Sequence, residues 1–207
     1  MNRSRKLSEQ LIVETALQLL NERGERDFSM RKLASLLDVD AMAIYHHFSN
    51  KSDLIHAVLQ AMMERCEIPP STSNWQQDIR NLCACLRSVA KSNPGAFCVY
   101  ETYERWLPAE HRLQEAFHSV LLKAGFSPKV VVRAVRVLWA YTESMSVDEV
   151  SGWLEPANSA ELSDSLMAGD YLTLIELVDE LTSVDVASEF ELGLKMIISG
   201  LQTEGNR

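Results

Sequence analysis

The chain has 207 residues, 46% of them hydrophobic and 24% charged, which is typical of a globular protein rather than a disordered or fibrous one. No apolar run reaches the roughly 20 residues of a membrane-spanning helix, and the basic start lacks the apolar core of a secretory signal. We therefore expect a cytoplasmic protein with no membrane partner. The net charge of −9, taken over the whole chain, argues against nucleic-acid binding, but the charge is unevenly distributed. Residues 1–66 carry nine basic and nine acidic side chains, so all the excess acidity lies in residues 67–207.

Apolar residues recur at helical spacing, and the chain has no convincing strand pattern or hairpin dipeptide, so we expect an all-α fold. Side chains suited to capping precede four segments of the first third: Ser8, Ser29, Asp40 and Asn50. Gly24 is expected to end the first helix. The third helix is short, from Ala41 to about Phe48, and a tight turn separates it from the second.

The clearest break in the chain is the proline-rich stretch at residues 68–74. It divides the sequence into a smaller domain at 1–67 and a larger helical domain at 68–207. Six helical segments are expected in the larger domain: Trp75–Ser92, Pro94–Trp106, Pro108–Ala124, Pro128–Val150, about Asp170–Leu181, and Val184–Gln202. Residues 151–169 are rich in small polar residues, which favours a long mobile loop.

Residues 29–48 have the pattern of a helix-turn-helix, in which the second short helix lies in the major groove of DNA. Arginine can contact guanine or phosphate, methyl-bearing side chains can contact thymine, and Tyr and His can donate hydrogen bonds to phosphate. The candidate DNA contacts are Arg31, Ala41, Met42, Ala43, Tyr45, His46, His47 and Lys51. Short amphipathic helix pairs are common, so spacing alone also allows Tyr45 to be a core-edge aromatic and the two histidines an exposed polar pair.

Three motifs raise the case for DNA binding: residues 11–24 read LIVETALQLLNERG, residues 28–40 read FSMRKLASLLDVD, and residues 43–55 read AIYHHFSNKSDLI. This series resembles the TetR family of bacterial repressors. The resemblance implies a homodimer that binds a palindromic double-stranded operator, and repression as its usual mode. The larger domain is similar to the tetracycline-repressor subgroup at residues 73–81, 123–127 and 190–201.

The last predicted helix carries two apolar stripes, which indicates burial on two sides. Phe190, Leu194, Ile197 and Leu201 form one stripe; Leu192, Gly193, Met196 and Gly200 form the other. We expect one stripe to pack within the subunit and the other, with residues 128–150, to pair with a second copy. The alternative is a central core helix in a monomer.

A small-molecule effector is expected in the middle of the larger domain, where aromatic side chains gather near a few polar ones. By the resemblance, the pocket and magnesium positions of the tetracycline repressor fall on Glu67, Leu82, Leu86, Val99, Thr102, Phe117 and Asp148. Only Thr102 keeps the expected residue, Asp148 replaces one acid by another, and the metal-holding histidines are absent. The effector is therefore expected to be mainly apolar or aromatic, with no metal or cofactor. The candidate ligand contacts are Leu82, Leu86, Tyr100, Thr102, Tyr103, Trp106, Phe117, Trp139 and Glu143. Ordinary core packing is the alternative for each.

Four cysteines are too few for a disulfide framework in a chain of this length, so reduced, mostly buried thiols are expected. A cysteine-based redox or metal-responsive regulator is the alternative function, although Cys83 and Cys85 point to different faces of one helix. An enzyme is not expected, because no common catalytic signature is present. A co-regulator that acts only through protein contacts is a third possibility, since Ala41, Met42 and Ala43 offer few polar contacts to bases.

Overall fold

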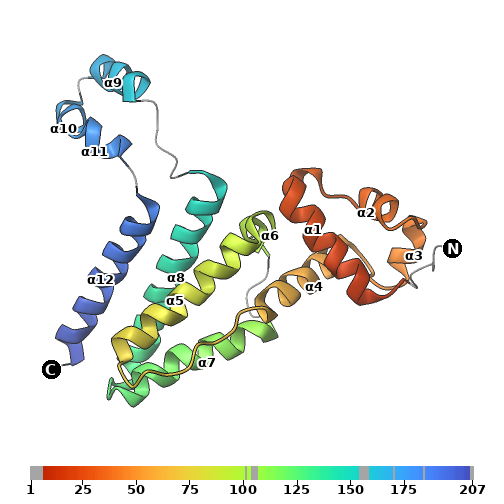
Figure 1. Ribbon diagram of the computed structural model, residues 1–207, viewed down its shortest axis with the longest axis horizontal. Coiled ribbons are helices and arrows are strands. Elements are labelled where there is room, and N and C mark those ends of the chain that lie inside the picture. Colours follow the sequence, from red (N-terminus) through yellow and green to blue (C-terminus); the bar gives the residue numbers. More distant parts are fainter. Residues whose placement is uncertain are drawn as a thin grey trace.

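The computed structural model describes residues 7–100, 102–103, 107–153, 159–169, 171–183 and 185–205. All regular structure in these residues is helical, which confirms the all-α expectation. Four helices form a head at one end of the molecule: α1 (Glu9–Asp27), α2 (Met30–Leu36), α3 (Ala41–Tyr45) and α4 (Lys51–Glu64). The head lies at the opposite side of the molecule from the C-terminus (Figure 1).

All four predicted helix caps are present in the head. The side chains of Ser8, Ser29, Asp40 and Asn50 accept hydrogen bonds from the backbone amides of Leu11, Lys32, Met42 and Asp53. Each bond satisfies an amide that has no partner within its helix, which fixes where the helix starts. Gly24 interrupts α1 with a positive φ of 69°, but helical structure resumes and continues to Asp27. The expected stop at Gly24 is therefore a kink.

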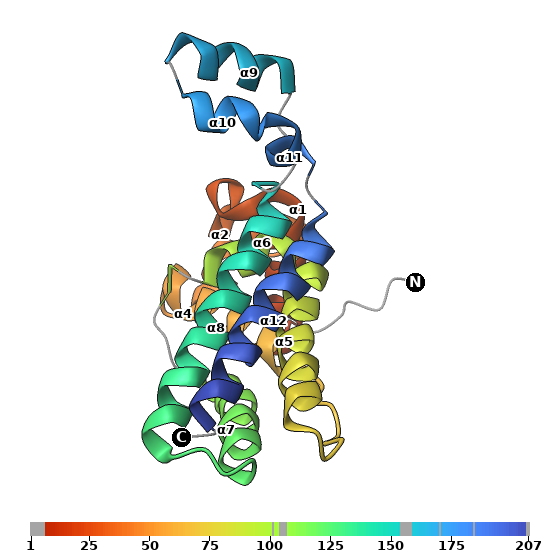
Figure 2. The same cartoon turned by 90° about the vertical axis from the view of Figure 1, so that its left-hand side faces the viewer.

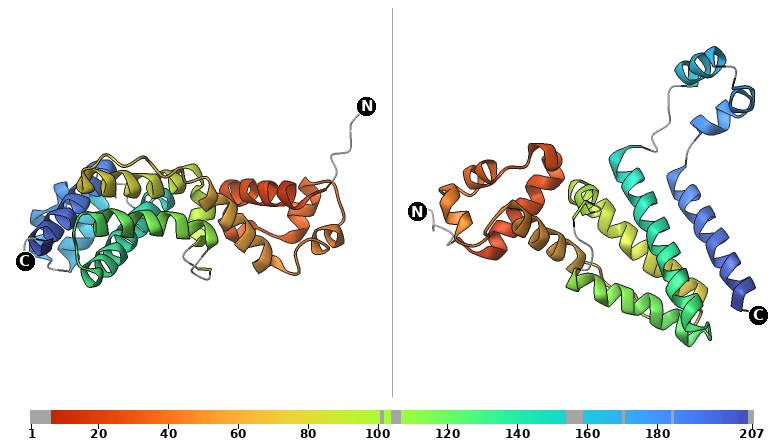
Figure 3. Two further views of the ribbon diagram at one scale, coloured as in Figure 1. Left: turned by 90° about the horizontal axis from the view of Figure 1, so that it is seen from below. Right: turned by 180° about the vertical axis from the view of Figure 1, so that it is seen from behind.

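The body of the molecule is a bundle of α5 (Trp75–Ser92), α6 (Pro94–Tyr100), α7 (Pro108–Lys123), α8 (Pro128–Ser151) and α12 (Val186–Gly205). Helix α5 packs on α7 and on α8, which also contact each other, and α12 lies along α8 (Figures 1 and 2). The long helix pair α8 and α12 thus forms one outer wall of the body. The other wall, made by α5 and α7, faces the linker that comes from the head (Figure 3).

The segment between α8 and α12 corrects the expectation of a long loop over residues 151–169. It contains the helix α9 (Ser159–Ala168), followed by two short helices, α10 (Leu172–Glu176) and α11 (Val178–Thr182), where one helix was expected. These three helices form an arm that projects beyond the body (Figure 2). The small polar residues favoured a loop, but Leu162 and Leu166 are one helical turn apart, and Leu166 is buried.

The head and the body meet where α1 crosses α6, at Gly95. A Cβ atom on Gly95 would lie 2.0 Å from the backbone oxygen of Leu20, so only glycine allows this approach. The side chain of Asn21 links the two helices at the crossing. Its Oδ1 accepts a hydrogen bond from the Ala96 amide, and its Nδ2 donates one to the side chain of Asn93. Helix α4 packs on both units, against α1 in the head and against α6 and α7 in the body. The head is therefore joined to the body along two helices.

The linker between α4 and α5 is anchored by the buried carboxylate of Asp78. This group accepts hydrogen bonds from the hydroxyl of Ser71 and from both the amide and the hydroxyl of Thr72, each at 2.7 Å. Burial by itself raises the pKa of Asp78, but the hydrogen bonds from Ser71 and Thr72 outweigh it and hold this pKa below its usual value of 3.8. The charged form is therefore the one that stabilises the linker.

We expect Asp78→Asn to lower the free energy of unfolding at pH 7 by about 1–3 kcal/mol, because an amide cannot accept all three bonds. A lowered folded-state pKa stabilises the fold above the unfolded value of 3.8, and this gain is lost as the pH falls through the folded-state pKa. The difference between variant and parent should thus shrink in acid. Urea denaturation at pH 7 and at about pH 3, at one protein concentration, measures it. Asp164→Asn, at an exposed carboxylate on α9, is the control. An equal difference at both pH values would contradict the assignment.

Candidate DNA and effector sites

Helix α3 packs on the rest of the head through one buried side chain, and its outer face is exposed to solvent. Ile44 is fully buried, while Met42 and Tyr45 are 62% and 42% exposed. The caps at Ser29 and Asp40 place α2 and α3 on either side of a tight turn, in which Asp38 adopts a positive φ of 55°. An outward-facing second helix after a tight turn is the geometry that enters a major groove.

The predicted DNA contacts fall into two groups by exposure. Arg31, Met42, Tyr45, His46 and His47 are exposed, whereas Ala41, Ala43 and Lys51 are half-buried. Sequence reasoning passed over Lys32, which is exposed next to Arg31 and pairs with Asp27 at 3.1 Å. These positions lie on the N-terminal part of α2, on α3 with the turn that follows it, and at the start of α4. Their roles in DNA binding stay predictions.

Lys51 lies at the N-terminus of α4 and is tied to the rest of the head. Its ammonium group is 3.7 Å from Glu25 Oε1 and sits over the ring of Phe28, 5.4 Å from the centroid. The same Glu25 oxygen accepts a hydrogen bond of 3.3 Å from the hydroxyl of Tyr103, which belongs to the body. Burial and then the charge of Glu25 raise the pKa of Tyr103, so the phenol keeps its proton. Glu25 thus connects a predicted phosphate contact with a predicted ligand contact.

Most of the predicted ligand contacts lie in the interior of the body. Leu82, Leu86, Tyr100, Phe117, Trp139 and Glu143 are all buried. Phe117 and Trp139 meet edge to face with their ring centroids 6.2 Å apart, and Tyr100 donates a hydrogen bond to Glu110. Thr102 is exposed and Tyr103 is half-buried. Trp106 lies outside the described residues. Their role in ligand binding remains a prediction.

A polar strip of α8 runs through this packed region. Thr142 is buried and donates to the backbone of Leu138, and Glu143 and Ser146 are buried beside it. Among the described residues, Ser146 Oγ is the buried side-chain oxygen with no hydrogen-bond partner. A buried hydroxyl without a partner costs free energy unless something binds to it. The strip therefore offers a bound molecule a hydrogen-bonding group inside an apolar region.

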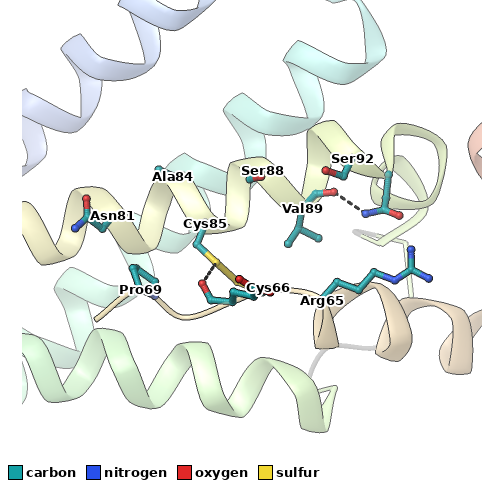
Figure 4. Close-up of a pocket in the computed structure, with 11 residues that line it drawn as sticks. Arg65, Cys66, Pro69, Asn81, Ala84, Cys85, Ser88, Val89 and Ser92 are labelled. Atoms are coloured by element: carbon teal, nitrogen blue, oxygen red, sulfur yellow. Dashed lines mark hydrogen bonds between the residues drawn. A yellow bond between two sulfur atoms is a disulfide. The ribbon is translucent and has the colours of Figure 1, made fainter. Parts of the chain in front are cut away.

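A cavity lies elsewhere, between the linker and the outer face of α5. It has a volume of about 700 Å³, and its lining includes Arg65, Asn81, Ser88 and the sulfur-bearing Cys66 and Cys85 (Figure 4). A smaller cavity of about 180 Å³ separates the linker from α7 and includes one predicted contact, Leu82. No group of three or more His, Cys, Asp or Glu side chains is arranged to hold a metal in the part of the chain that the structure describes.

Two of the four cysteines correct the expectation of reduced thiols. Cys66 and Cys85 form a disulfide; they are 19 positions apart in the sequence, and their Cα atoms are 6.2 Å apart. Cys83 and Cys98 lie outside it. The sequence could not reveal this pair, because the approach of the linker to α5 is a tertiary contact. Cys85 faces the linker, whereas Cys83 is buried against α8 and contacts Thr142.

The comparisons with known proteins agree with this geometry along nearly the whole chain. Residues 12–58 match "Bacterial regulatory proteins, tetR family", and residues 69–204 match "Tetracyclin repressor-like, C-terminal domain". None of the helices in the described residues is both long and apolar enough to cross a membrane.

Among curated proteins, the chain is similar to an HTH-type transcriptional regulator of Saccharopolyspora erythraea, with 29% identity over 94% of this chain and 84% of that protein. It is similar to the class C tetracycline repressor protein of Escherichia coli, with 28% identity over 95% of this chain and 91% of that protein.

Two solved structures from Streptomyces coelicolor share the fold. A possible TetR family transcriptional regulator has 28% identity and a TM-score of 0.84, over 95% of this chain and 99% of that one. ActR in complex with (S)-DNPA has 25% identity and a TM-score of 0.79, over 96% of this chain and 98% of that one. The match to the tetracycline-repressor-like C-terminal domain alone covers more than half of the residues of this chain. The chain therefore belongs to the TetR family of bacterial regulatory proteins.

Proposed function

We propose that the protein is a cytoplasmic repressor that binds a palindromic operator as a homodimer and leaves it when a small effector binds. The observation that carries this proposal is the open outer face of α3, which presents Met42, Tyr45, His46 and His47 at the far end of the head. The family membership and the regulators among its relatives support it.

The second copy is proposed to cover the outer wall made by α8 and α12. Apolar side chains are exposed on both helices: Val132, Val137, Leu192 and Met196. Ala140, after Val137, and Gly200, after Met196, are small and exposed and would allow a close approach of helices. An interface in which each copy contributes the same helix pair is closed by a twofold axis, so it forms a dimer and no higher assembly. Such a dimer carries two heads, as a palindrome requires.

The stripes of α12 need one adjustment for this interface. Phe190 and Leu194 are buried within the subunit and Leu192 and Met196 are exposed, as the two-stripe interpretation expects. Ile197 and Leu201 are only half-buried, and Ile198, which neither stripe included, is buried in their place. Gly193, however, belongs to the inner side, because a Cβ atom there would lie 2.2 Å from the hydroxyl of Tyr141. That hydroxyl donates to the backbone oxygen of Phe190, which fixes α12 against α8.

The arm provides further apolar surface near this interface. Met167, Tyr171, Leu172, Leu174, Leu177 and Leu181 are all more than 40% exposed. A patch of this kind on a projecting segment indicates a protein contact. The arm leaves α8 and returns to α12, so it is continuous with the proposed interface, and a second copy is the occupant we assign to it (Figure 2).

The effector is proposed to bind among the buried side chains of α5, α6, α7 and α8, beside the polar strip of α8. Phe117 and Trp139 would contact an aromatic effector, and Ser146 would hydrogen-bond to it. Because these side chains are buried, we expect binding to move them, and this movement can reach the head through α6 and α4. A ligand complex of ActR supports the presence of an effector site in this fold.

DNA binding is tested with labelled DNA from the region flanking the gene, by fluorescence anisotropy over a series of salt concentrations. We expect a tight complex whose affinity falls as salt rises, since the phosphate contacts release counterions. Arg31→Ala should weaken it by about 1–3 kcal/mol, or about 5- to 150-fold in Kd, because a bidentate contact is lost. Lys129→Ala, which removes an exposed charge from the start of α8, is the matched control. Absence of any salt-sensitive complex would instead favour a co-regulator that acts through protein contacts.

Calorimetric titration with tetracycline and Mg²⁺ is expected to show no tight, magnesium-dependent binding. The physical reason is that two metal-binding side chains are missing. By the resemblance, Glu67 and Val99 occupy the positions of histidines that hold the metal. Glu67 is exposed, and Val99 is buried and offers no ligand atom. An aromatic compound without a chelating group is the class we expect to bind. Tight tetracycline binding that disappears on chelation of Mg²⁺ would overturn the proposed effector class.

A further inference from the structure

The Cys66–Cys85 disulfide lies where the head connects to the body. Cys66 follows the last turn of α4 and is buried, with its amide donating to the backbone oxygen of Met63. Cys85 is half-buried on α5 and faces the cavity of about 700 Å³ between α5 and the linker (Figure 4). A Cα separation of 6.2 Å is within the range that a disulfide spans without backbone movement.

The bond fixes the end of a helix that both units share. Helix α4 packs on α1, and Ile55 and Val58, which precede its last turn, are fully buried, so we expect this part of the helix to move with the head. Its last turn is held on α7 by two hydrogen bonds: Gln60 accepts from the Ala109 amide at 3.0 Å, and Arg112 donates to the backbone oxygen of Glu64 at 3.1 Å. The disulfide adds a covalent tie from this turn to α5, in the centre of the body. Breaking it leaves only non-covalent contacts at that point.

Both oxidant and reductant can reach the pair through the cavity. The sulfur of Cys85 lies 3.3 Å from the backbone oxygen of Glu67, so a reduced Cys85 thiol can donate there and stay close to Cys66. Cys83, two residues away, has a different environment. Burial raises the pKa of the Cys83 thiol to about 12, which keeps it protonated and unreactive. The chain thus holds one pair of cysteines placed for exchange and one buried thiol protected from it.

We propose that Cys66 and Cys85 form a reversible thiol–disulfide switch, set by hydroperoxides and reset by small thiols, that controls how firmly α4 is held and thereby the affinity for DNA. Disulfides inside cells are mostly transient and redox-sensing, which fits a pair exposed to a cavity. The DNA part of this inference rests on the proposed function above.

The oxidation needs one co-reactant, hydrogen peroxide; an organic hydroperoxide would give an alcohol in place of the first water. The Cys85 thiolate attacks one peroxide oxygen, the O–O bond breaks, and the leaving hydroxide takes the proton that the thiol lost, which gives a sulfenic acid and water. The Cys66 thiolate then attacks the sulfenic sulfur. The S–S bond forms, the S–O bond breaks, and hydroxide leaves with the Cys66 proton as a second water. Two electrons pass from the sulfur pair to the peroxide. Two equivalents of a small thiol reverse the change.

The test compares the full-length protein treated with hydrogen peroxide and with dithiothreitol. Differential alkylation and mass spectrometry should find Cys66 and Cys85 oxidised together and reversibly. Hydrogen exchange at the end of α4 should be slower in the oxidised form, because opening there requires movement away from α5. The Kd for the flanking DNA should differ by about 5-fold or more between the two forms, the lower end of an ordinary coupling.

Cys85→Ser should give the same Kd in peroxide and in dithiothreitol, whereas Cys98→Ser should respond like the parent. Equal exchange and equal Kd in the two forms of the parent would overturn the switch, as would a pair that stays reduced in peroxide. If neither form binds DNA, the proposed function fails instead. The alkylation and exchange measurements then still decide whether the pair is a switch of α4.

Discussion

The double substitution Leu192→Glu and Met196→Glu should convert the protein from a dimer to a monomer and abolish tight operator binding. Both side chains are exposed on the outer face of α12, at 46% and 64%. In the proposed dimer they are buried against a second copy, where carboxylates would lose their water without gaining partners. Losing the second head should weaken operator binding by about 100-fold or more, the usual gain from linking two binding sites.

Sedimentation at working concentrations measures the first effect, and anisotropy with the flanking DNA measures the second. The matched control is Leu122→Glu, an equally apolar residue that is 49% exposed near the end of α7. It should leave both the dimer and the affinity unchanged. A parent protein that sediments as a stable monomer would refute the proposed pairing, whatever the variants do.

Gly95→Ala should have the largest effect on the fold of any single methyl group added to this chain. The new Cβ would lie 2.0 Å from the Leu20 oxygen and 2.9 Å from the Asn21 Cα, and both atoms belong to the backbone of α1. Backbone cannot rotate away as a side chain can, so α1 and α6 must separate. Overpacking of this kind costs about 1–3 kcal/mol, and we expect the upper end here. The crossing joins head and body, so DNA binding should weaken as well.

Urea denaturation and the same DNA titration measure these effects. Ser92→Ala, at an exposed position near the end of α5, is a control that adds no contact with α1. Asn21→Ala separates the two parts of the joint, because it removes the hydrogen bond to Ala96 and keeps the glycine. Its effect should be smaller, about 0.5–1.5 kcal/mol for a lost hydrogen bond. A Gly95→Ala variant as stable as the parent would show that the helices are less closely packed than described.

The helices whose local signals agree were predictable from the sequence. Ser29, Asp40 and Asn50 each cap a helix that begins where the capping side chain predicts. Proline at Pro108 and Pro128 likewise marks the first residue of α7 and α8. These signals act within a few residues, so no knowledge of the tertiary structure is needed to read them.

Features that depend on contacts between distant parts of the chain could not be predicted from the sequence. The small polar residues of 151–169 favour a loop, whereas the helix α9 packs on α10 and α11, which come later in the chain. The disulfide was missed for the same reason, since residues 19 apart meet only after the linker lies on α5. The predicted ligand contacts are a third case. Aromatic residues that pack a core and aromatic residues that bind an effector have the same sequence pattern, and only a bound ligand distinguishes the two roles.

The arm has a consequence for how the protein is made. If the arm is covered in the proposed dimer, a newly synthesised subunit exposes Tyr171, Leu172 and the neighbouring apolar side chains to water until it pairs. Such a surface favours binding by chaperones, degradation by proteases, or aggregation with other unassembled subunits. The amount of active regulator in a cell should therefore rise more steeply than the rate of translation. A bacterium that makes too few copies would lose most of them to degradation before they assemble.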